Sequence, residues 1–307
     1  MDTGGRTARA GDRGNRLFSA LLAAILIAFL AATLLVLMSN IWYLAQAKTT
    51  QGQGGWQIFV GALRDPEVHF AMRLSVTTAL MTMVISLLFA IPAAYVLSRY
   101  RFRGEKLVDT LLDLPIVVPP PVIGMSLLMF FMTPLGALVN RLTPAPVVIL
   151  LNRFLTLATG HPISDDGSTW VYTTRGIVLA QFFIACAFGV RAIKATFDTI
   201  GARHEQVART LGCTRMQAFF KVVLPMAGTG IIAGAVMTWA RAIAEFGPVM
   251  FFTGSTRWKT EVMPISMFLM YSGAEIEKAV ALVIIMIMIS TVTLLAFKRL
   301  GGKGYLW

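Results

Sequence analysis

Two ionisable side chains, Arg241 and Glu245, stand in an otherwise apolar stretch of the sequence. Their spacing puts both on the same face of a helix, close enough to form an ion pair. An ionisable residue inside a membrane segment is costly to keep in lipid and therefore indicates a functional role. Arg241 is the better candidate for attracting an anion. The alternative, which we favour for the pair, is mutual neutralisation at a buried subunit contact.

Residue patterns for catalysis or metal binding are absent from the sequence. His69, His161 and His204 are scattered, and no His/Glu metal motif or nucleophile triad is present. Cys186 lies in an apolar stretch and Cys213 in a polar one, so neither a disulfide nor a metal cluster is implied. We therefore expect no catalytic residue and no metal site in this chain.

The composition indicates which elements carry these residues. Of 307 residues, 56% are hydrophobic and 14% are charged, and the mean hydropathy is +0.71. A soluble domain usually has about 25% charged residues, so the chain is predicted to be an integral membrane protein. Several apolar stretches reach roughly 20 residues, the length at which a helix crosses the hydrocarbon core. Backbone groups in lipid find no water to bond, so these spans must be helices.

The predicted fold class is therefore an all-α polytopic membrane protein. We place six transmembrane helices at Leu17–Leu44, Phe70–Leu97, Leu107–Met132, Gly176–Phe197, Met226–Phe246 and Ala279–Phe297. They form one membrane domain, 17–300, between an N-terminal tail, 1–16, and a C-terminal tail, 301–307. Residues 45–47, Ala-Gln-Ala, resemble a signal-peptidase site. The apolar run before them exceeds the roughly 7–15 residues of a signal peptide, so we favour an uncleaved anchor.

The basic residues lie between the spans rather than in one patch, although the net charge is +12. This distribution argues against nucleic-acid binding. It indicates instead which of the loops between spans lie in the cytoplasm. Most basic residues are cytoplasmic if the N-terminus is inside, so both termini are predicted to face the cytoplasm, next to membrane lipid. The apolar run Pro146–Ala158 is too short to span, and we expect an interfacial or re-entrant helix there. If it did cross, the basic residues between Arg191 and Lys221 would move outside.

Prolines interrupt the third predicted span. It opens with Asp109 and Asp113 and then contains a cluster of prolines, Pro115, Pro119, Pro120 and Pro121. Proline removes a backbone donor and disfavours helix in the residue before it. An unwound stretch at this depth must be buried in protein or line a cavity. A structural kink and a direct role in translocation are both open, and the candidate residues of the translocation path are Pro119, Pro120, Arg241 and Glu245.

The segment between the fourth and fifth spans, 198–225, is predicted to form a cytoplasmic helix-turn-helix. The run Thr199–Leu211 suits a helix, Gly212 can take the left-handed conformation that ends it, and Thr214 can cap a second helix. Pro225 then opens the fifth span. A patch of small and apolar side chains suited to a groove on a partner consists of Val207, Ala208 and Leu211. A DNA-binding role is a poor rival because both ends are tied to membrane helices.

The same segment resembles the signature of ABC importer permeases, E-A-A-x3-G-x9-I-x-L-P, with matching spacing throughout. The corresponding residues are Gln206, Val207, Ala208, Gly212, Val222, Leu224 and Pro225. Gln206 replaces the signature glutamate and Val207 the first alanine; Glu205, directly before, could supply the missing charge. In that family the segment is the coupling helix that docks in a cleft of the ATP-hydrolysing subunit. The resemblance implies ATPase-coupling roles for Glu205, Gln206, Val207, Ala208, Leu211, Gly212, Leu224 and Pro225.

Several partners are implied by this resemblance. No Walker A sequence, G-x4-G-K-[ST], occurs in the chain. ATP and Mg²⁺ are therefore expected on separate ABC ATPase subunits, and this chain is expected to be a non-catalytic translocation subunit without a cofactor. A periplasmic or lipid-anchored substrate-binding protein is expected to deliver the cargo. Six spans make half a pathway, so we expect a second permease subunit, with a homodimer favoured, in the bacterial inner membrane.

Two further stretches indicate the chemical class of the cargo. Residues 114–121, Leu-Pro-Ile-Val-Val-Pro-Pro-Pro, and 241–247, Arg-Ala-Ile-Ala-Glu-Phe-Gly, resemble permeases for molybdate, tungstate and sulfate. Residues 257–260, Arg-Trp-Lys-Thr, are similar to a basic stretch of the sulfate and tungstate relatives, and the outer loop 133–174 is longer than usual. We favour molybdate or tungstate over sulfate or thiosulfate. The rival class, an ATP-independent channel or secondary transporter, does not explain the signature and predicts an inverted repeat that the sequence does not show.

Overall fold

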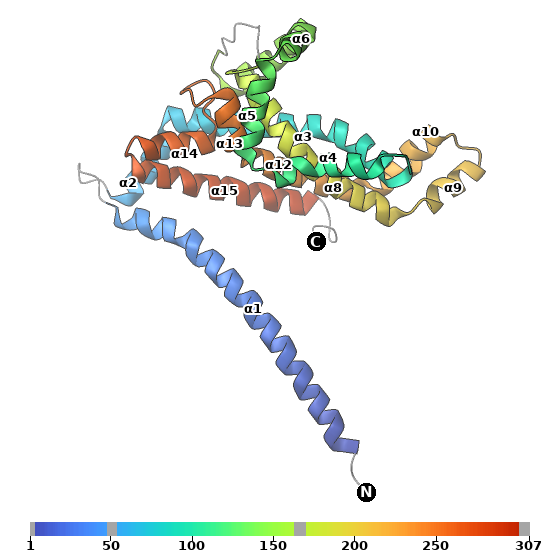
Figure 1. The fold of residues 1–307 in the computed structure, drawn as a ribbon. Coiled ribbons are helices and arrows are strands. Elements are labelled where there is room, and N and C mark those ends of the chain that lie inside the picture. Colours follow the sequence, from blue (N-terminus) through green and yellow to red (C-terminus); the bar gives the residue numbers. More distant parts are fainter. Residues whose placement is uncertain (1–3, 48–53, 163–169, 301–307) are drawn as a thin grey trace. The chain divides into compact units, whose positions relative to one another are not determined.

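A computed structural model describes residues 4–47, 54–162 and 170–300 (Figure 1). Every regular element in these ranges is a helix, which confirms the all-α fold for the described part of the chain. The predicted C-terminal tail, 301–307, and a part of the predicted outer loop, 163–169, lie outside the described residues.

Contacts divide the chain into two compact units, Met1–Gly61 and Ala62–Trp307. The first unit holds α1 (Gly4–Gln46) and most of α2 (Gly55–Arg64). The apolar part of α1, Phe18–Gln46, has 29 residues and a mean hydropathy of 2.9. It is therefore long and apolar enough to cross a membrane.

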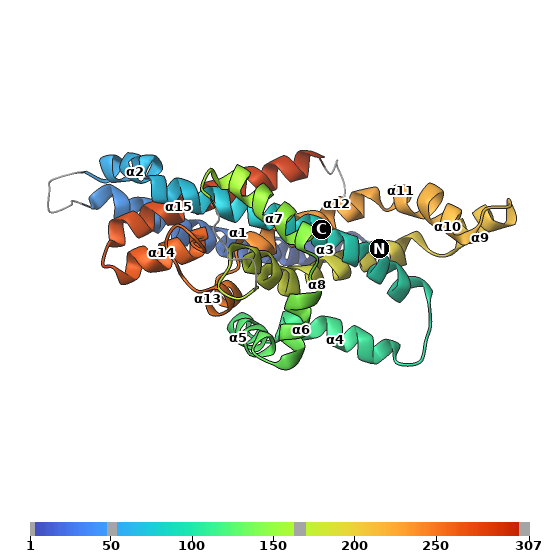
Figure 2. The ribbon, with the colours of Figure 1, turned by 90° about the horizontal axis from the view of Figure 1, so that it is seen from above.

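The second unit holds the other helices. They are α3 (Pro66–Arg99), α4 (Glu105–Val117), α5 (Pro120–Phe131), α6 (Pro134–Leu142), α7 (Ala145–Thr159), α8 (Thr174–Ile200), α9 (Arg203–Thr210), α10 (Arg215–Ala218), the π-helical turn η1 (Phe219–Val223), α11 (Leu224–Met226), α12 (Gly228–Ile243), α13 (Gly247–Thr253), α14 (Met263–Ser272) and α15 (Ile276–Leu300). Within this unit, α9 and α10 lie at one end, and α13 and α14 lie toward the other (Figures 1 and 2).

Four helices of the described chain could each cross a membrane, and the number rises to as many as seven if each of three bent helix pairs is one span. The third predicted span contains the break that its prolines predict, and the helix at the fifth is shorter than predicted. In place of Leu107–Met132 the structure has α4 and α5, which meet at 110° and are joined by extended backbone at Val118 and Pro119. In place of Met226–Phe246 it has the shorter α12, bent by 71° from the helix before it.

The run predicted as interfacial or re-entrant, Pro146–Ala158, lies within α7. This helix has 15 residues, fewer than a span needs on its own, and it packs along α3. It follows α6 at an angle of 79°.

Helices α3, α8 and α12 pack against one another at the centre of the second unit (Figure 2). Gly230 and Gly234 of α12 have the GxxxG spacing, and both face α8 of the same chain. A Cβ atom at Gly230 would lie 2.0 Å from Oγ1 of Thr196, and one at Gly234 would lie 2.7 Å from Cγ1 of Ile193. The two glycines therefore serve close packing within the chain.

Buried polar side chains join α3 to α8. The Thr82 hydroxyl donates to Oε1 of Gln181 at 2.9 Å, and Nε2 of Gln181 donates to the Thr78 hydroxyl at 3.4 Å. Such bonds hold helices together where lipid offers no hydrophobic driving force.

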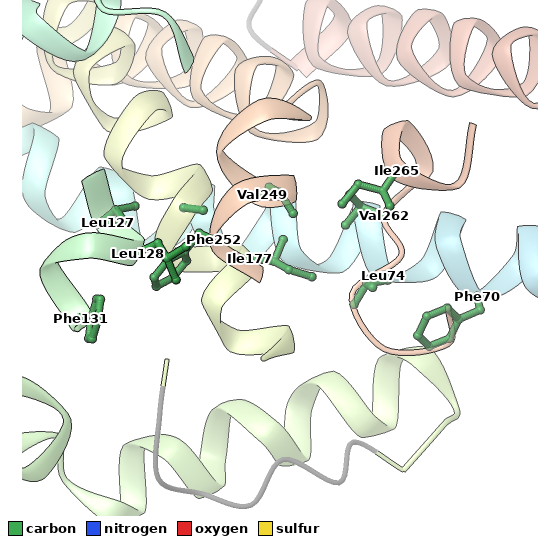
Figure 3. Close-up of a cluster of buried hydrophobic side chains, with 11 residues drawn as sticks. Phe70, Leu74, Leu127, Leu128, Phe131, Ile177, Val249, Phe252, Val262 and Ile265 are labelled. Atoms are coloured by element: carbon green, nitrogen blue, oxygen red, sulfur yellow. The ribbon is translucent and has the colours of Figure 1, made fainter. Parts of the chain in front are cut away.

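Two hydrophobic clusters stabilise the two ends of α3. The cluster near α13 and α14 is drawn in Figure 3 and consists of Phe70, Leu74, Leu127, Leu128, Phe131, Ile177, Ala180, Val249, Phe252, Val262 and Ile265. The cluster near α9 and α10 consists of Ala90, Ala94, Leu97, Val190, Ile193, Phe197, Val223 and Ala227. Phe70 and Leu97 lie near opposite ends of α3, so the two clusters anchor different functional segments.

Candidate functional site

The coupling segment, residues 198–225, contains two helices joined by a tight turn. Gly212 has φ +93°, and the Thr214 side chain caps α10 in a reciprocal pair of bonds with Gln217. Both features follow the local chemistry that the sequence predicts. The single helix predicted for Thr199–Leu211 is wrong, because α8 ends at Ile200 and α9 begins at Arg203. Gly201 between them has φ +67° and ψ +155°, a conformation open essentially to glycine alone.

The second limb of the coupling segment leads into α12. The turn η1 precedes Pro225, and the backbone N–H of Leu224 bonds the carbonyl of Phe219, five residues earlier. Pro225 lies in the last turn of this limb rather than at the beginning of the next helix, and the chain bends after it, at Ala227. Leu224 and Pro225 therefore connect the two helices to α12 and are not part of α9.

One face of α9 is attached to the end of α3. Nε of Arg99 lies 3.6 Å from Oε2 of Glu205, and these side chains are only 8% and 12% exposed. Nη2 of Arg99 also donates to the Gly201 carbonyl at 3.3 Å. The Tyr95 side chain interacts with Glu205 and packs on the Phe219 ring at a centroid distance of 4.6 Å. Glu205 is thus engaged by Arg99 and Tyr95 inside the chain.

The other face of α9 and the start of α10 are open. Leu211 is 81% exposed, and Gln206, Val207 and Met216 are exposed as well. We call these four residues the docking face. Ala208, predicted to belong to the exposed patch, is only 7% exposed because it faces the rest of the chain. Met216 was not predicted from the sequence; its position in the first turn of α10, two residues after the predicted cap Thr214, is the feature that indicates it.

The proline-rich break of the third predicted span contacts the residues that follow the fifth. Pro119 is the last extended residue before α5, and Pro120 is the first residue of that helix. A Cβ atom at Gly124 would lie 2.6 Å from Cα of Pro248, and one at Gly247 would lie 2.8 Å from Cγ of Pro121. The proline-rich break and the residues that follow Glu245 are therefore in direct contact, and the predicted path residues fall in one region.

Arg241 and Glu245 form the predicted ion pair. Nη2 of Arg241 lies 2.9 Å from Oε1 of Glu245, whose side chain is 1% exposed. The Arg241 guanidinium also lies over the Phe188 ring, 5.6 Å from its centroid. The arginine is partly exposed and the glutamate is buried, so the arginine neutralises a carboxylate that could not stay charged alone.

The basic stretch 257–260 is also engaged by the chain itself. Nε of Arg257 lies 3.1 Å from Oε1 of Glu67. Nearby Glu261 is fully buried, and its carboxylate accepts a bond from the Trp258 backbone N–H at 3.3 Å. Burial raises the pKa of Glu261 to about 7. Arg257 therefore lies in a cluster with two carboxylates, although 52% of its side chain remains exposed.

Known proteins match most of the chain. The family model of the binding-protein-dependent transport system inner membrane component matches residues 86–303. The molybdate/tungstate transport system permease protein WtpB of Thermococcus kodakarensis is 35% identical over 234 residues, 76% of each chain. The sulfate transport system permease protein CysT of Salmonella typhimurium is 29% identical over 251 residues, 82% of this chain and 83% of the relative. The molybdenum transport system permease protein ModB of Mycobacterium tuberculosis is 31% identical over 240 residues, 78% of this chain and 82% of the relative.

Solved structures share the fold. A bacterial ABC transporter involved in the import of the acidic polysaccharide alginate superposes with a TM-score of 0.63 over 96% of this chain and 98% of that chain, at 17% identity. This likeness concerns the fold alone. The family match includes the coupling segment and both broken spans, and the relatives are permeases of sulfate, molybdate or tungstate transport systems. The chain therefore belongs to the family of binding-protein-dependent transport system inner membrane components, the permeases of ABC importers.

Proposed function

We propose that this permease subunit moves a tetrahedral oxyanion, molybdate or tungstate, from the periplasm to the cytoplasm. The observation that carries this proposal is the 35% identity with a molybdate/tungstate permease over 76% of each chain. A sulfate or thiosulfate permease is the second candidate, because the sulfate relative matches a larger share of the chain, 82%, at 29% identity.

A transport route needs to attract an oxyanion without trapping it. Such an anion requires positive potential and hydrogen-bond donors in place of its hydration shell. The Arg241–Glu245 pair supplies a guanidinium whose charge is balanced, at the place where Pro121 meets Gly247. We infer that Arg241 gives the anion a weak, passing contact near the broken segment at Pro119 and Pro120, since conduction requires that binding be weak enough for release.

We infer that the docking face binds the ABC ATPase subunit, which carries ATP and Mg²⁺. Exposed apolar side chains flanked by the basic residues Arg209 and Arg215 suit a groove on a partner protein. Glu205 and Ala208 hold α9 to the permease, and Gly212 sets the turn. Leu224 and Pro225 join the segment to α12. This chain is then the translocation subunit, and ATP hydrolysis takes place on the partner.

The remaining partners follow the family. A periplasmic or lipid-anchored binding protein delivers the anion, and a second permease subunit, which we take to be an identical copy, completes the route. A solved relative of the same fold is an alginate ABC transporter in complex with its pentasaccharide-bound periplasmic protein. We place the chain in the bacterial inner membrane with both termini in the cytoplasm.

The test is anion uptake and ATP hydrolysis by this chain together with its ATPase and binding protein in proteoliposomes. Molybdate or tungstate should stimulate hydrolysis and accumulate inside. Stimulation by sulfate alone would defeat the cargo preference but keep the importer. Uptake that needs no ATP would overturn the importer and support a channel or secondary transporter.

A further inference from the structure

Arg191 of α8 forms ion pairs with two aspartates of α4. Its Nη1 lies 2.7 Å from Oδ1 of Asp109, its Nε lies 2.6 Å from Oδ1 of Asp113, and its Nη2 lies 2.5 Å from Oδ2 of Asp113. The same Nη2 donates to the Asp109 backbone carbonyl at 2.9 Å. The planar guanidinium uses its fork geometry on both carboxylates, an arrangement that lysine could not reproduce.

Helix α4 has little else to hold it. None of its residues, all of them described, is buried in the chain. Only Leu112 packs against the cluster of hydrophobic side chains near α9 and α10. An open apolar groove of about 660 Å³ runs beside the later part of the helix, and its lining includes Leu114 of α4 and Phe183 of α8. The Arg191 contacts are therefore the main specific attachment of α4 to α8.

Non-helical joints flank α4 at both ends. Gly104, directly before the helix, has φ +93°, and the extended residues Val118 and Pro119 follow it. A rigid helix between two such joints can rotate as a body once its attachment opens. The side chains of Arg191, Asp109 and Asp113 are 28%, 40% and 43% exposed, so the cluster is not sealed inside the chain.

We propose that Arg191, Asp109 and Asp113 form a latch that holds the half-span α4 against α8 and that opens and closes during transport. The three side chains are positioning residues: they set where α4 lies and have no contact with the cargo. The latch joins α8, which leads into the coupling segment, to α4, which leads into the proline break. Motion of the coupling segment thereby reaches the region of Pro119 and Pro120.

The first test opens the latch in the assembled complex, with hydrogen exchange as the readout. Arg191→Gln, and separately Asp109→Asn with Asp113→Asn, should speed exchange of the α4 amides about tenfold or more, since local opening sets these rates. Lys194→Gln, which removes the exposed pair with Asp198 on α8, is the matched control and should leave α4 unchanged. Unchanged α4 exchange in both latch variants, or faster exchange spread evenly over the second unit, overturns the latch. The exchange measurement needs no cargo. Its result therefore tests the latch separately from the proposed function.

The second test closes the latch. Asp113→Cys with Arg191→Cys, in a background with Cys186→Ser and Cys213→Ser, is bridged with a short bifunctional thiol reagent. Uptake should fall to background relative to the same variant before cross-linking and return on reduction. A bridge between cysteines at Lys194 and Asp198, within α8, should have no effect. Undiminished uptake by the bridged α4–α8 complex overturns the proposal, and the exchange test decides alone if the double-cysteine variant is inactive beforehand.

Discussion

The two ends of the second unit are held together by different contacts. At the α9–α10 end, charged side chains on separate helices pair across the gaps: Arg99 with Glu205, and Arg191 with Asp109 and Asp113. At the α13 end, glycine and proline bring backbones into direct contact at Gly124 and Gly247, alongside the charge pairs Arg241–Glu245 and Arg257–Glu67.

This difference indicates where the molecule can move. Polar contacts between helices can separate when water takes their place, and Gly104, Gly201 and Gly212, all with positive φ, flank the helices of the α9–α10 end. Close backbone packing at Gly124 and Gly247 cannot separate without leaving a void. We expect the first end to transmit motion and the second to stay rigid.

The largest effect is expected at the turn of the coupling segment. Gly212→Pro should abolish anion-stimulated ATP hydrolysis by the reconstituted complex, because proline cannot adopt φ +93°. Gly212→Asn, which tolerates the left-handed region, should keep most of the stimulation. Membrane insertion of both variants should be normal. Undiminished hydrolysis in Gly212→Pro would remove the coupling role from this segment.

The rigid end is tested by Gly124→Ala. The added methyl group would lie 2.6 Å from Cα and 2.7 Å from the carbonyl oxygen of Pro248, and backbone cannot move aside cheaply. We expect the free energy of unfolding to fall by about 1–3 kcal/mol, measured by thermal unfolding in detergent. Gly228→Ala, at a helical site with open space, is the control and should be neutral or stabilising. Equal stability of the two variants would show that this end is not tightly packed.

The two faces of α9 should respond differently. Glu205→Ala removes the partner of a buried Arg99 and should destabilise α9 by about 1–2 kcal/mol, seen as faster hydrogen exchange of its amides. Gln206→Ala, one residue further, should leave exchange unchanged and weaken binding of the ATPase. The reverse pattern would show that the inward and outward faces of α9 are assigned wrongly.

The smallest effect concerns pH at Glu261. Burial raises its pKa from 4.5 to about 7, so the folded chain keeps this proton to higher pH than the unfolded chain does. Stability should therefore fall as pH rises from about 4.5 through 7, and Glu261→Gln should flatten that part of the curve of Tm against pH. Glu105→Gln, at an exposed pair with Arg101, should leave the slope unchanged. A slope that persists in Glu261→Gln assigns the dependence to another group.

Local chemistry explains which features were predictable from the sequence. Gly212 and Thr214 were placed correctly because a left-handed turn and a helix cap depend on neighbouring residues only. The break near Pro119 was also predictable from proline, but the 110° angle was not, because it is set by packing of α5 on α13.

The contacts between distant segments had no local pattern. Glu205 looked like a surface charge because Arg99 precedes it by more than one hundred residues. Asp109 and Asp113 were visible at the start of the third span, yet their partner Arg191 lies on another helix. Ala208 was assigned to the exposed face because the break at Gly201, which changes the direction of α9, was not foreseen.

The most direct test of the central claim is photo-cross-linking from the docking face. A photoreactive residue at Leu211, which is 81% exposed, should cross-link to the ATPase subunit in the assembled complex. The same residue at Arg101, exposed at the same end but outside the docking face, should give a much weaker product. Absence of an ATPase product from Leu211 in a complex that still hydrolyses ATP would contradict the assignment of this segment as the coupling site.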